Sequence, residues 1–330
     1  MKRIDMETHF LSKSLYKALK ERTEAPYMDE NDVCIFGPDC ALPYGHMIDR
    51  LMDLGDGRIR EMDQAGIDVQ CISCVGGIET LPPEIGEEVA IESNNELYEA
   101  IQKYPDRYKG YAILAPHRVE KAVKELERCI NEFGFIGWNA FSNFGEDALD
   151  DPKYRPLVKK CEELGAIVYI HPAMSTIERL HGLGRQLIAS GMGFGIDTMI
   201  TTERLMLTGV FDEMPNLKIL LGHLGEGFPY VMDRMKIRGP LKNRLPAVNL
   251  KAPKEYLLTN IYIVTSGNYS EPALICGKTA LGSDRIMLGS DYPMEKLVDS
   301  VVFLEKAGIT DEERTQIYFE NAQCVFCKSN

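Results

Sequence analysis

The sequence of 330 residues lacks an excess of basic side chains and lacks a long apolar run. Its 37 Lys and Arg residues are outnumbered by 50 Asp and Glu residues, which gives a formal net charge of −13 at pH 7. Such a charge opposes binding to nucleic acid or to an anionic membrane surface. No window approaches about 18 uninterrupted apolar residues, and the first residues, Met-Lys-Arg-Ile-Asp, form no apolar signal core. These absences predict a cytoplasmic protein whose partners include neither nucleic acid nor membrane.

A disulfide framework is not expected either. The nine cysteines are an odd number scattered along a long chain, which is typical of free thiols in a reducing compartment. Cys71 and Cys74, like Cys324 and Cys327, have the CxxC spacing of half a zinc ribbon. The first pair falls in an expected strand and the second in an expected last helical turn, so the context disfavours a structural zinc site.

The sequence does contain a regular alternation of short apolar runs and amphipathic stretches. The runs predict strands at 2–8, 69–74, 111–115, 135–140, 166–171, 217–223, 260–266 and 285–290. Helical patterns between them occupy 47–65, 87–103, 119–133, 153–164, 201–213, 225–238, 272–281 and 294–307. This alternation predicts an α/β fold, a (β/α)8 TIM barrel. The length suits one such barrel, so we expect a single domain over residues 1–330.

Two long connections interrupt the alternation. Residues 11–46 follow the first expected strand and contain enough Phe, Tyr, Leu and Ile to favour packing over disorder. An insertion after a barrel strand lies at the catalytic face, where loops form the substrate pocket. A second connection, about 172–200, is rich in Gly and Met and is expected to form another wall of that pocket.

Four of the expected strands end in residues that bind metals or transfer protons. These residues are Glu7, His9, His171, His223 and Asp291. Because a barrel gathers the carboxyl ends of its strands at one face, we expect these side chains to lie close together. Burying them unpaired would cost several kcal/mol each, a cost that a divalent cation offsets. Imidazole and carboxylate ligands suit zinc or manganese, so we expect one divalent ion per chain.

Spacing adds detail to two of these positions. Glu7 and His9 are two residues apart on a strand, so both side chains point to the same side, which must be the barrel interior if both reach a metal. Glu226 follows His223 by three residues at the start of a helix. It either accepts a hydrogen bond from the imidazole and fixes its tautomer, or it interacts only with the helix dipole. The spacing by itself favours neither interpretation.

These motifs together resemble a known group of enzymes, the amidohydrolase-related decarboxylases. The group includes aminocarboxymuconate semialdehyde, γ-resorcylate, dihydroxybenzoate and 5-carboxyvanillate decarboxylases. The resemblance is carried by Glu7-x-His9, His171-Pro172, Gly222-His223-Leu-Gly-Glu226 and Ser290-Asp291-Tyr-Pro293. It extends from residue 2 to about residue 327 and is weakest over 11–46 and 238–258.

The resemblance implies a metal-dependent, nonoxidative decarboxylase of a hydroxylated aromatic carboxylic acid that forms a homodimer or homotetramer. The implied ligands of a zinc or manganese ion are Glu7, His9, His171 and Asp291. By the same comparison Asp291 also donates the proton to the ring carbon, and His223 and Glu226 lie beside the substrate. The implied substrate-binding residues are Arg58 and Arg234, and each could instead be a solvated helix residue. Glu7, in place of the first His of the superfamily's HxH pair, favours the aromatic decarboxylases within the group.

Two other functions remain open at this point. The same residues could hydrolyse an amide, ester or lactone with a water molecule activated by the metal. The chain could also be a metal-binding scaffold without catalytic activity, although every expected ligand position is filled.

Overall fold

The computed structural model describes residues 1–37, 39–238 and 248–326 and contains a parallel sheet of eight strands. In sheet order the strands are β1 (Ile4–Phe10), β5 (Val69–Cys74), β6 (Tyr108–Ala112), β7 (Gly137–Phe141), β10 (Ile167–His171), β11 (Ile219–Leu221), β12 (Ile261–Val264) and β13 (Ile286–Met287). The last and first strands are joined by backbone hydrogen bonds, among them Met6 N to Leu288 O at 2.8 Å. The sheet therefore closes on itself, and the predicted (β/α)8 TIM barrel is confirmed.

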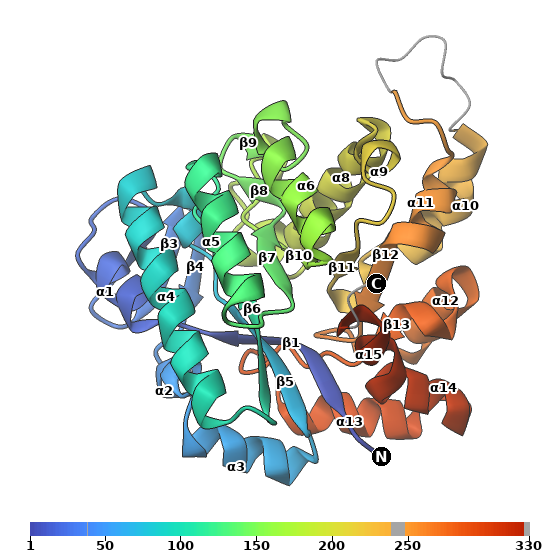
Figure 1. Cartoon of the computed structure of the whole chain (residues 1–330), viewed down its shortest axis with the longest axis horizontal. Helices are drawn as coiled ribbons and strands as arrows, with labels where there is room; N and C mark the ends of the chain where they lie inside the picture. The colour runs from blue at the N-terminus through green and yellow to red at the C-terminus, as the bar shows by residue number, and fades with distance from the viewer. Residues whose placement is uncertain (38, 239–247, 327–330) are drawn as a thin grey trace.

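Helices cover the outside of the barrel (Figure 1). The larger ones are α3 (Asp56–Ala65), α4 (Pro83–Lys103), α5 (Val119–Asn131), α6 (Arg155–Leu164), α8 (Gly193–Leu207), α10 (Phe228–Arg238), α12 (Glu271–Leu281) and α13 (Leu297–Lys306). Shorter ones are α2 (Ile48–Met52), α7 (Arg185–Ile188), α9 (Val210–Glu213), α11 (Pro253–Asn260), α14 (Asp311–Thr315) and α15 (Asn321–Phe326). None of the helices in the described part of the chain is long and apolar enough to span a membrane.

Two of the predicted helices were wrong in extent. The helix expected at 47–65 is divided into α2 and α3, because the Asp53 carboxylate accepts hydrogen bonds from Gly55 N at 2.7 Å and Arg58 N at 3.0 Å. A side chain that takes these backbone donors competes with a continuous helix. The helix expected at 201–213 begins earlier, at Gly193, and ends before Gly209, whose φ of 76° is left-handed.

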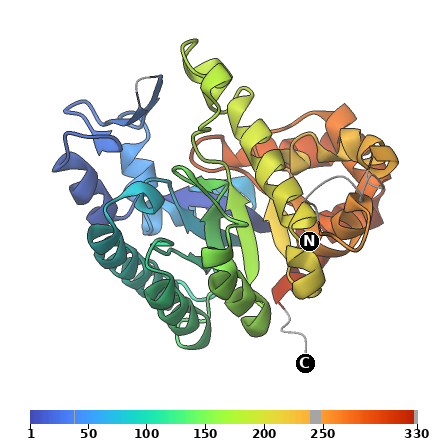
Figure 2. The same ribbon diagram turned by 90° about the horizontal axis from the view of Figure 1, so that it is seen from above.

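The insertion after β1 is ordered and packed against the barrel. It contains α1 (Lys13–Lys20) and an antiparallel sheet of β2 (Tyr27–Met28), β3 (Val33–Gly37) and β4 (Cys40–Pro43). Leu15, Leu19 and Met28 are buried in the main hydrophobic core. In Figures 1 and 2 the insertion, in blue, lies to one side of the barrel strands. Phe36, Leu42 and Tyr44 of this insertion line a cavity that His9 and Asp291 also line.

The barrel interior is apolar at its amino-terminal end. Its buried cluster contains Ile4, Met6, Val69, Cys71, Tyr111, Ile167, Tyr169, Leu220, Val264 and Met287. Alternate residues on the same strands, such as Val168 and Ile170 of β10, instead belong to the core between strands and helices. Cys71 and Cys74 also belong to different cores. They cannot act as one zinc-binding pair, and Cys327 lies outside the described residues.

An irregularity in β1 changes which side chains face the interior. The pairing of β1 with β5 shifts register between Asp5 and Thr8. Strict alternation from Ile4 and Met6 would send Thr8 inward, but a bulge changes the phase of the strand by one residue. Thr8 Oγ1 instead donates to Cys71 O at 3.1 Å, and Glu7 and His9 face the site.

Candidate active site

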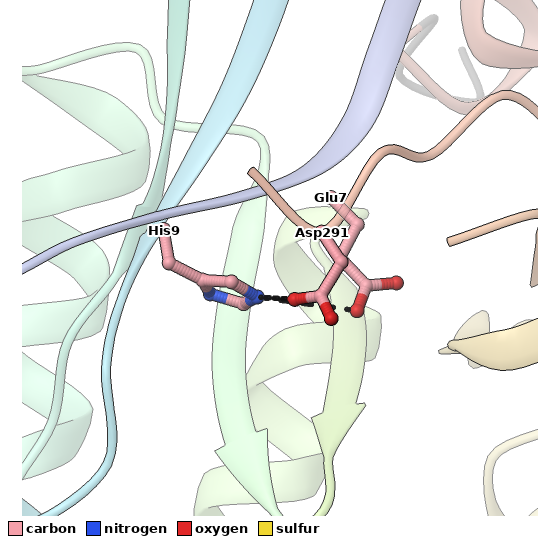
Figure 3. Close-up of side chains that lie close together, drawn as sticks. All are labelled: Glu7, His9 and Asp291. Carbon is pink, nitrogen blue, oxygen red and sulfur yellow. Dashed lines mark ion pairs between the residues drawn. The ribbon is translucent and has the colours of Figure 1, made fainter. Parts of the chain in front are cut away.

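Three metal-binding side chains converge at the carboxyl ends of β1 and β13. Ligand atoms of Glu7, His9 and Asp291 all lie within 4.8 Å of one another. His9 Nε2 is 3.0 Å from Asp291 Oδ1 and 4.0 Å from Glu7 Oε1. Figure 3 shows the two carboxylates next to each other, with the edge of the His9 ring pointing at them. These three residues, far apart in the sequence, thus form one compact group that could hold a metal ion, here called the metal-binding cluster.

Hydrogen bonds to a serine determine the tautomer of His9. Ser73 Oγ, at the end of β5, lies 2.9 Å from His9 Nδ1 and donates its own proton to Thr8 O at 3.1 Å. The hydroxyl must then accept from Nδ1–H, which leaves Nε2 as the ring nitrogen that faces Glu7 and Asp291. A partner on the far ring nitrogen is what orients a metal-binding imidazole.

Glu7 is held in a comparable way. Ser266 Oγ, after β12, donates to Glu7 Oε2 at 2.5 Å and accepts from His223 N at 3.1 Å. Burial raises the pKa of the Glu7 carboxyl, and the nearby Asp291 charge adds to that effect. Both serines close expected strands, but a single Ser at a strand end is too common to identify such a role from sequence.

The side chains present fit a divalent cation. Glu7 Oε1 and His9 Nε2 are buried and have no hydrogen-bond partner among the described residues. Buried polar atoms without partners are costly, and here they face each other and a second carboxylate. Carboxylate oxygens and imidazole nitrogens are ligands that manganese and zinc accept.

His171 lies beside this cluster but not within it. Its ring centroid is 4.8 Å from that of His9, with the two rings nearly perpendicular. Its Nδ1 is 2.7 Å from Pro172 O and can only donate there, because a carbonyl is an acceptor. Burial, together with the charge of His9, lowers the pKa of His171 to about 3. The imidazole is therefore neutral and keeps an unprotonated Nε2.

The predicted contact between His223 and Glu226 is present. His223 Nδ1 lies 2.6 Å from Glu226 Oε1, which decides between the two interpretations that the spacing left open. Burial opposes the charged imidazole, but Glu226, with Glu7 and Asp291, outweighs it and raises the pKa of His223 to about 10. Burial alone would raise the pKa of the Asp291 carboxyl. The neighbouring imidazoles outweigh burial and lower that pKa.

The backbone is strained in the loop after β11 and in the loop after β13. Five non-glycine residues of the described chain have positive φ, and four of them are His223, Leu224, Glu226 and Asp291, with φ between 53° and 61°. Such conformations are sparsely populated and concentrate where a site demands a particular side-chain direction. The loop after β11 and the loop after β13 are held in this way.

Neither predicted arginine is among the described residues that line the cavity at this face. Arg58 is fully buried in α3, where Nη1 donates to His9 O at 2.9 Å and Nε donates to Gln70 Oε1 at 2.7 Å. Its guanidinium therefore supports the end of β1 from behind. Arg234 is exposed on α10. The roles of both residues in substrate binding stay predictions.

The cavity has a volume of about 790 Å³ and extends from the metal-binding cluster to the insertion. His9, His171, His223 and Asp291 lie at one end, and the walls are mostly apolar, with Phe36, Leu42, Tyr44, Val75, Phe141 and Phe194 among them. A mostly apolar pocket with a few convergent polar groups suits a small aromatic ligand. Sequence reasoning missed several polar groups in its wall, among them Glu79 and Asn143, which follow strands without any recognisable motif.

Comparisons with known proteins agree with this fold and site. A family model described as amidohydrolase matches residues 4–326. The γ-resorcylate decarboxylase of a Polaromonas species is 33% identical over 322 residues, which cover 94% of this chain and 97% of that protein. A solved 2,6-dihydroxybenzoate decarboxylase in complex with 2,6-dihydroxybenzoate has a TM-score of 0.86 at 29% identity, over 99% of both chains.

A second solved structure carries a metal. It is the 5-carboxyvanillate decarboxylase of Novosphingobium aromaticivorans, complexed with manganese and 4-hydroxy-3-methoxy-5-nitrobenzoic acid. Its TM-score is 0.88 at 29% identity, over 98% of this chain and 96% of that one. The chain therefore belongs to the amidohydrolase family, as its motifs indicated. Within that family it is a carboxy-lyase, in a group of decarboxylases that act on hydroxylated aromatic acids.

Proposed function

We propose that this enzyme releases carbon dioxide from a hydroxybenzoate whose hydroxyl is ortho to the carboxylate. The observation that carries the proposal is the convergence of Glu7, His9 and Asp291 at one end of a mostly apolar cavity. The relatives named above, which decarboxylate hydroxylated aromatic acids, support the same reaction.

The proposed metal ligands are Glu7, His9, His171 and Asp291. A divalent cation at this place supplies positive charge that offsets the carboxylate and the ortho oxygen of the substrate. Manganese is our first choice, because a similar solved enzyme binds it. Ser73 and Ser266 orient the imidazole and the carboxylate that face the ion, so that little reorganisation is needed on binding.

The reaction itself exchanges a carboxylate for a proton at one ring carbon. In our proposal the Asp291 carboxylate takes up a proton from the site, for which His223 with its raised pKa of about 10 is the available donor, and delivers it to that carbon. The ring then regains the electron pair of the breaking C–C bond, and carbon dioxide leaves. His223, whose Nδ1 is held by Glu226, presents Nε2 to the phenolic oxygen or passes a proton to Asp291. The apolar walls hold the ring flat and exclude water from the reacting carbon.

A turnover assay tests the proposal directly. Protein loaded with manganese, and separately with zinc, is incubated with 2-hydroxybenzoate and the dihydroxybenzoates while carbon dioxide release is measured. We expect release from at least one acid with an ortho hydroxyl and none from 4-hydroxybenzoate, which lacks it. Hydrolysis of lactones or esters without release from any hydroxybenzoate would instead favour the hydrolase.

A further inference from the structure

The cavity contains one buried carboxyl group away from the metal-binding cluster. Glu79 belongs to a single 3₁₀ turn, Ile78–Thr80, that follows β5, and it is only 5% exposed. It is among the residues that line the cavity. The other acidic residues of the lining outside the cluster, Glu146, Glu178 and Glu295, are exposed. Nothing in the proposed reaction uses Glu79.

Contacts along the cavity wall place the Glu79 carboxyl relative to the metal-binding cluster. A Cβ atom added at Gly76 would lie 3.1 Å from Phe141 Cε1 and 3.4 Å from Glu79 Oε1, so Oε1 and the edge of the Phe141 ring both border the space at Gly76. The Phe141 ring is 5.4 Å from that of His171, and the His171 ring is 4.8 Å from that of His9. The carboxyl group is thus separated from the metal-binding cluster by two rings, along a wall that a flat substrate would follow.

The surroundings of Glu79 do not neutralise it. Oε2 accepts a hydrogen bond from Gly77 N at 2.8 Å, and the backbone N–H of Glu79 itself also bonds the carboxylate, but no ion pair to Glu79 is present in the described part of the chain. Burial, with a smaller contribution from the Glu79 charge, raises the pKa values of Cys34, Cys74 and Tyr44, so the carboxyl lies near two thiols and a phenol. Burial raises the pKa of Glu79 itself to about 7. A buried carboxyl with so few partners is costly unless a ligand supplies another.

We propose that Glu79 is a specificity-determining residue that hydrogen-bonds a second hydroxyl group on the substrate ring, distant from the carboxylate that leaves. The proposal rests on the function above, because the metal-binding cluster must hold the carboxylate end. A hydroxyl group matches Glu79 in either protonation state, since it donates to the carboxylate and accepts from the neutral carboxyl. A second carboxylate on the ring would meet repulsion whenever Glu79 is ionised.

A purely structural role is the competing explanation, because Glu79 also bonds the backbone of the turn. The test must therefore separate recognition from folding. Glu79→Gln keeps an acceptor for Gly77 N and the shape of the side chain, while Glu79→Leu removes every hydrogen bond. Glu84→Gln makes the same chemical change on the neighbouring helix α4, where the side chain is exposed and pairs with Arg118.

The experiment measures equilibrium binding to manganese-loaded protein by titration calorimetry. The ligands are 2-hydroxybenzoate and the 2,3-, 2,4-, 2,5- and 2,6-dihydroxybenzoates, so that each acid adds one hydroxyl at a known position. We expect the unsubstituted enzyme and Glu84→Gln to prefer one dihydroxybenzoate over 2-hydroxybenzoate. In Glu79→Leu that preference should fall by about 10- to 100-fold and in Glu79→Gln by less, with 2-hydroxybenzoate binding unchanged.

Equal weakening of all ligands in both Glu79 variants would assign the residue a structural role and overturn the proposal. The proposal would also be overturned if the unsubstituted enzyme bound all of these acids equally well. Because binding does not require turnover, the outcome is separable from the proposed reaction. A Glu79-dependent preference without carbon dioxide release would reject decarboxylation but support the Glu79 subsite. Carbon dioxide release without that preference would support decarboxylation but reject the Glu79 subsite.

Discussion

The two ends of the barrel interior differ sharply although the same strands form both. The amino-terminal end is filled by apolar side chains such as Leu220, Val264 and Met287. At the carboxyl-terminal end the interior positions of β1 are Glu7 and His9, which have buried polar atoms without a hydrogen-bond partner in the described part of the chain. One end stabilises the fold by burying apolar area, and the other carries an electrostatic cost that a cation removes. The apolar amino-terminal layer of the interior therefore stabilises the fold, and the polar carboxyl-terminal layer provides the reactive groups, as in other barrels of this kind.

The largest expected effect belongs to the polar layer. Asp291→Asn keeps an oxygen that can bind the cation but removes the carboxyl group that would hold the transferred proton. We expect kcat to fall by about a thousandfold or more, while metal content measured by elemental analysis stays near one ion per chain. Asp284→Asn, at the other end of β13, is the control and should be almost unaffected. Near-normal kcat in Asp291→Asn would remove this residue from the mechanism.

A substitution in the apolar layer should lower the stability of the fold and leave the metal content unchanged. Leu220→Ala removes a fully buried side chain from the interior cluster and leaves a cavity. We expect the free energy of unfolding, measured in urea, to fall by about 2–5 kcal/mol, with metal content unchanged. Loss of the metal without loss of stability would show that the two layers are not separate.

A smaller effect is expected behind the polar layer. Glu226→Gln keeps an acceptor for His223 Nδ1 but removes the charge that orients and polarises the imidazole. We expect kcat/KM to fall by about 10- to 100-fold, less than in Asp291→Asn, with the thermal midpoint almost unchanged. If the two variants proved equally inactive, the imidazole rather than Asp291 would be the better candidate for the proton donor.

The smallest effect concerns Glu79, on the wall between the metal-binding cluster and the insertion. Burial raises the pKa of its folded form to about 7, above the ordinary value of 4.5, so the folded protein binds this proton more tightly than the unfolded chain does. The native carboxyl therefore costs stability progressively from about pH 4.5 to pH 7, by at most about 3 kcal/mol. Glu79→Gln, which cannot ionise, should gain stability over the unsubstituted protein at pH 8 but hardly at pH 4.5.

Urea unfolding at both pH values measures this difference. Glu84→Gln serves again as the control and should follow the unsubstituted protein at both. A Glu79→Gln protein whose relative stability is the same at pH 4.5 and pH 8 would show that the carboxyl is better solvated than the structure indicates.

The barrel was predictable because its strands are buried on both faces and therefore stand out as apolar runs bounded by Gly and Pro. All eight strands overlap their predicted ranges. The third predicted strand, 111–115, agrees least well, because β6 begins earlier, at Tyr108. Helix ends were harder to predict. The division at Asp53 depends on a side chain that accepts backbone hydrogen bonds, and the early start of α8 has no composition signal.

The site was predictable where a residue follows a strand within a family motif. The residues found in this way are Glu7, His9, His171, His223 and Asp291. The structure brings them together, and all of them except Glu7 line one cavity. The position of Arg58 behind β1 was not predictable, because the direction of its side chain depends on how α3 packs against β1. Ser73, Ser266 and Glu79 were missed because ordinary polar residues acquire a role only through their neighbours in space.

The order of the strands, and the reactive residue at the end of each, are local properties, so the linear sequence by itself determined that a barrel would gather these groups at one face. Only the tertiary structure decided which way they point. The bulge between Asp5 and Thr8 arises from pairing with β5 and closure against β13, and it turns Glu7 and His9 inward above Met6. Such a change of phase depends on contacts between segments far apart in the chain, which no local pattern contains.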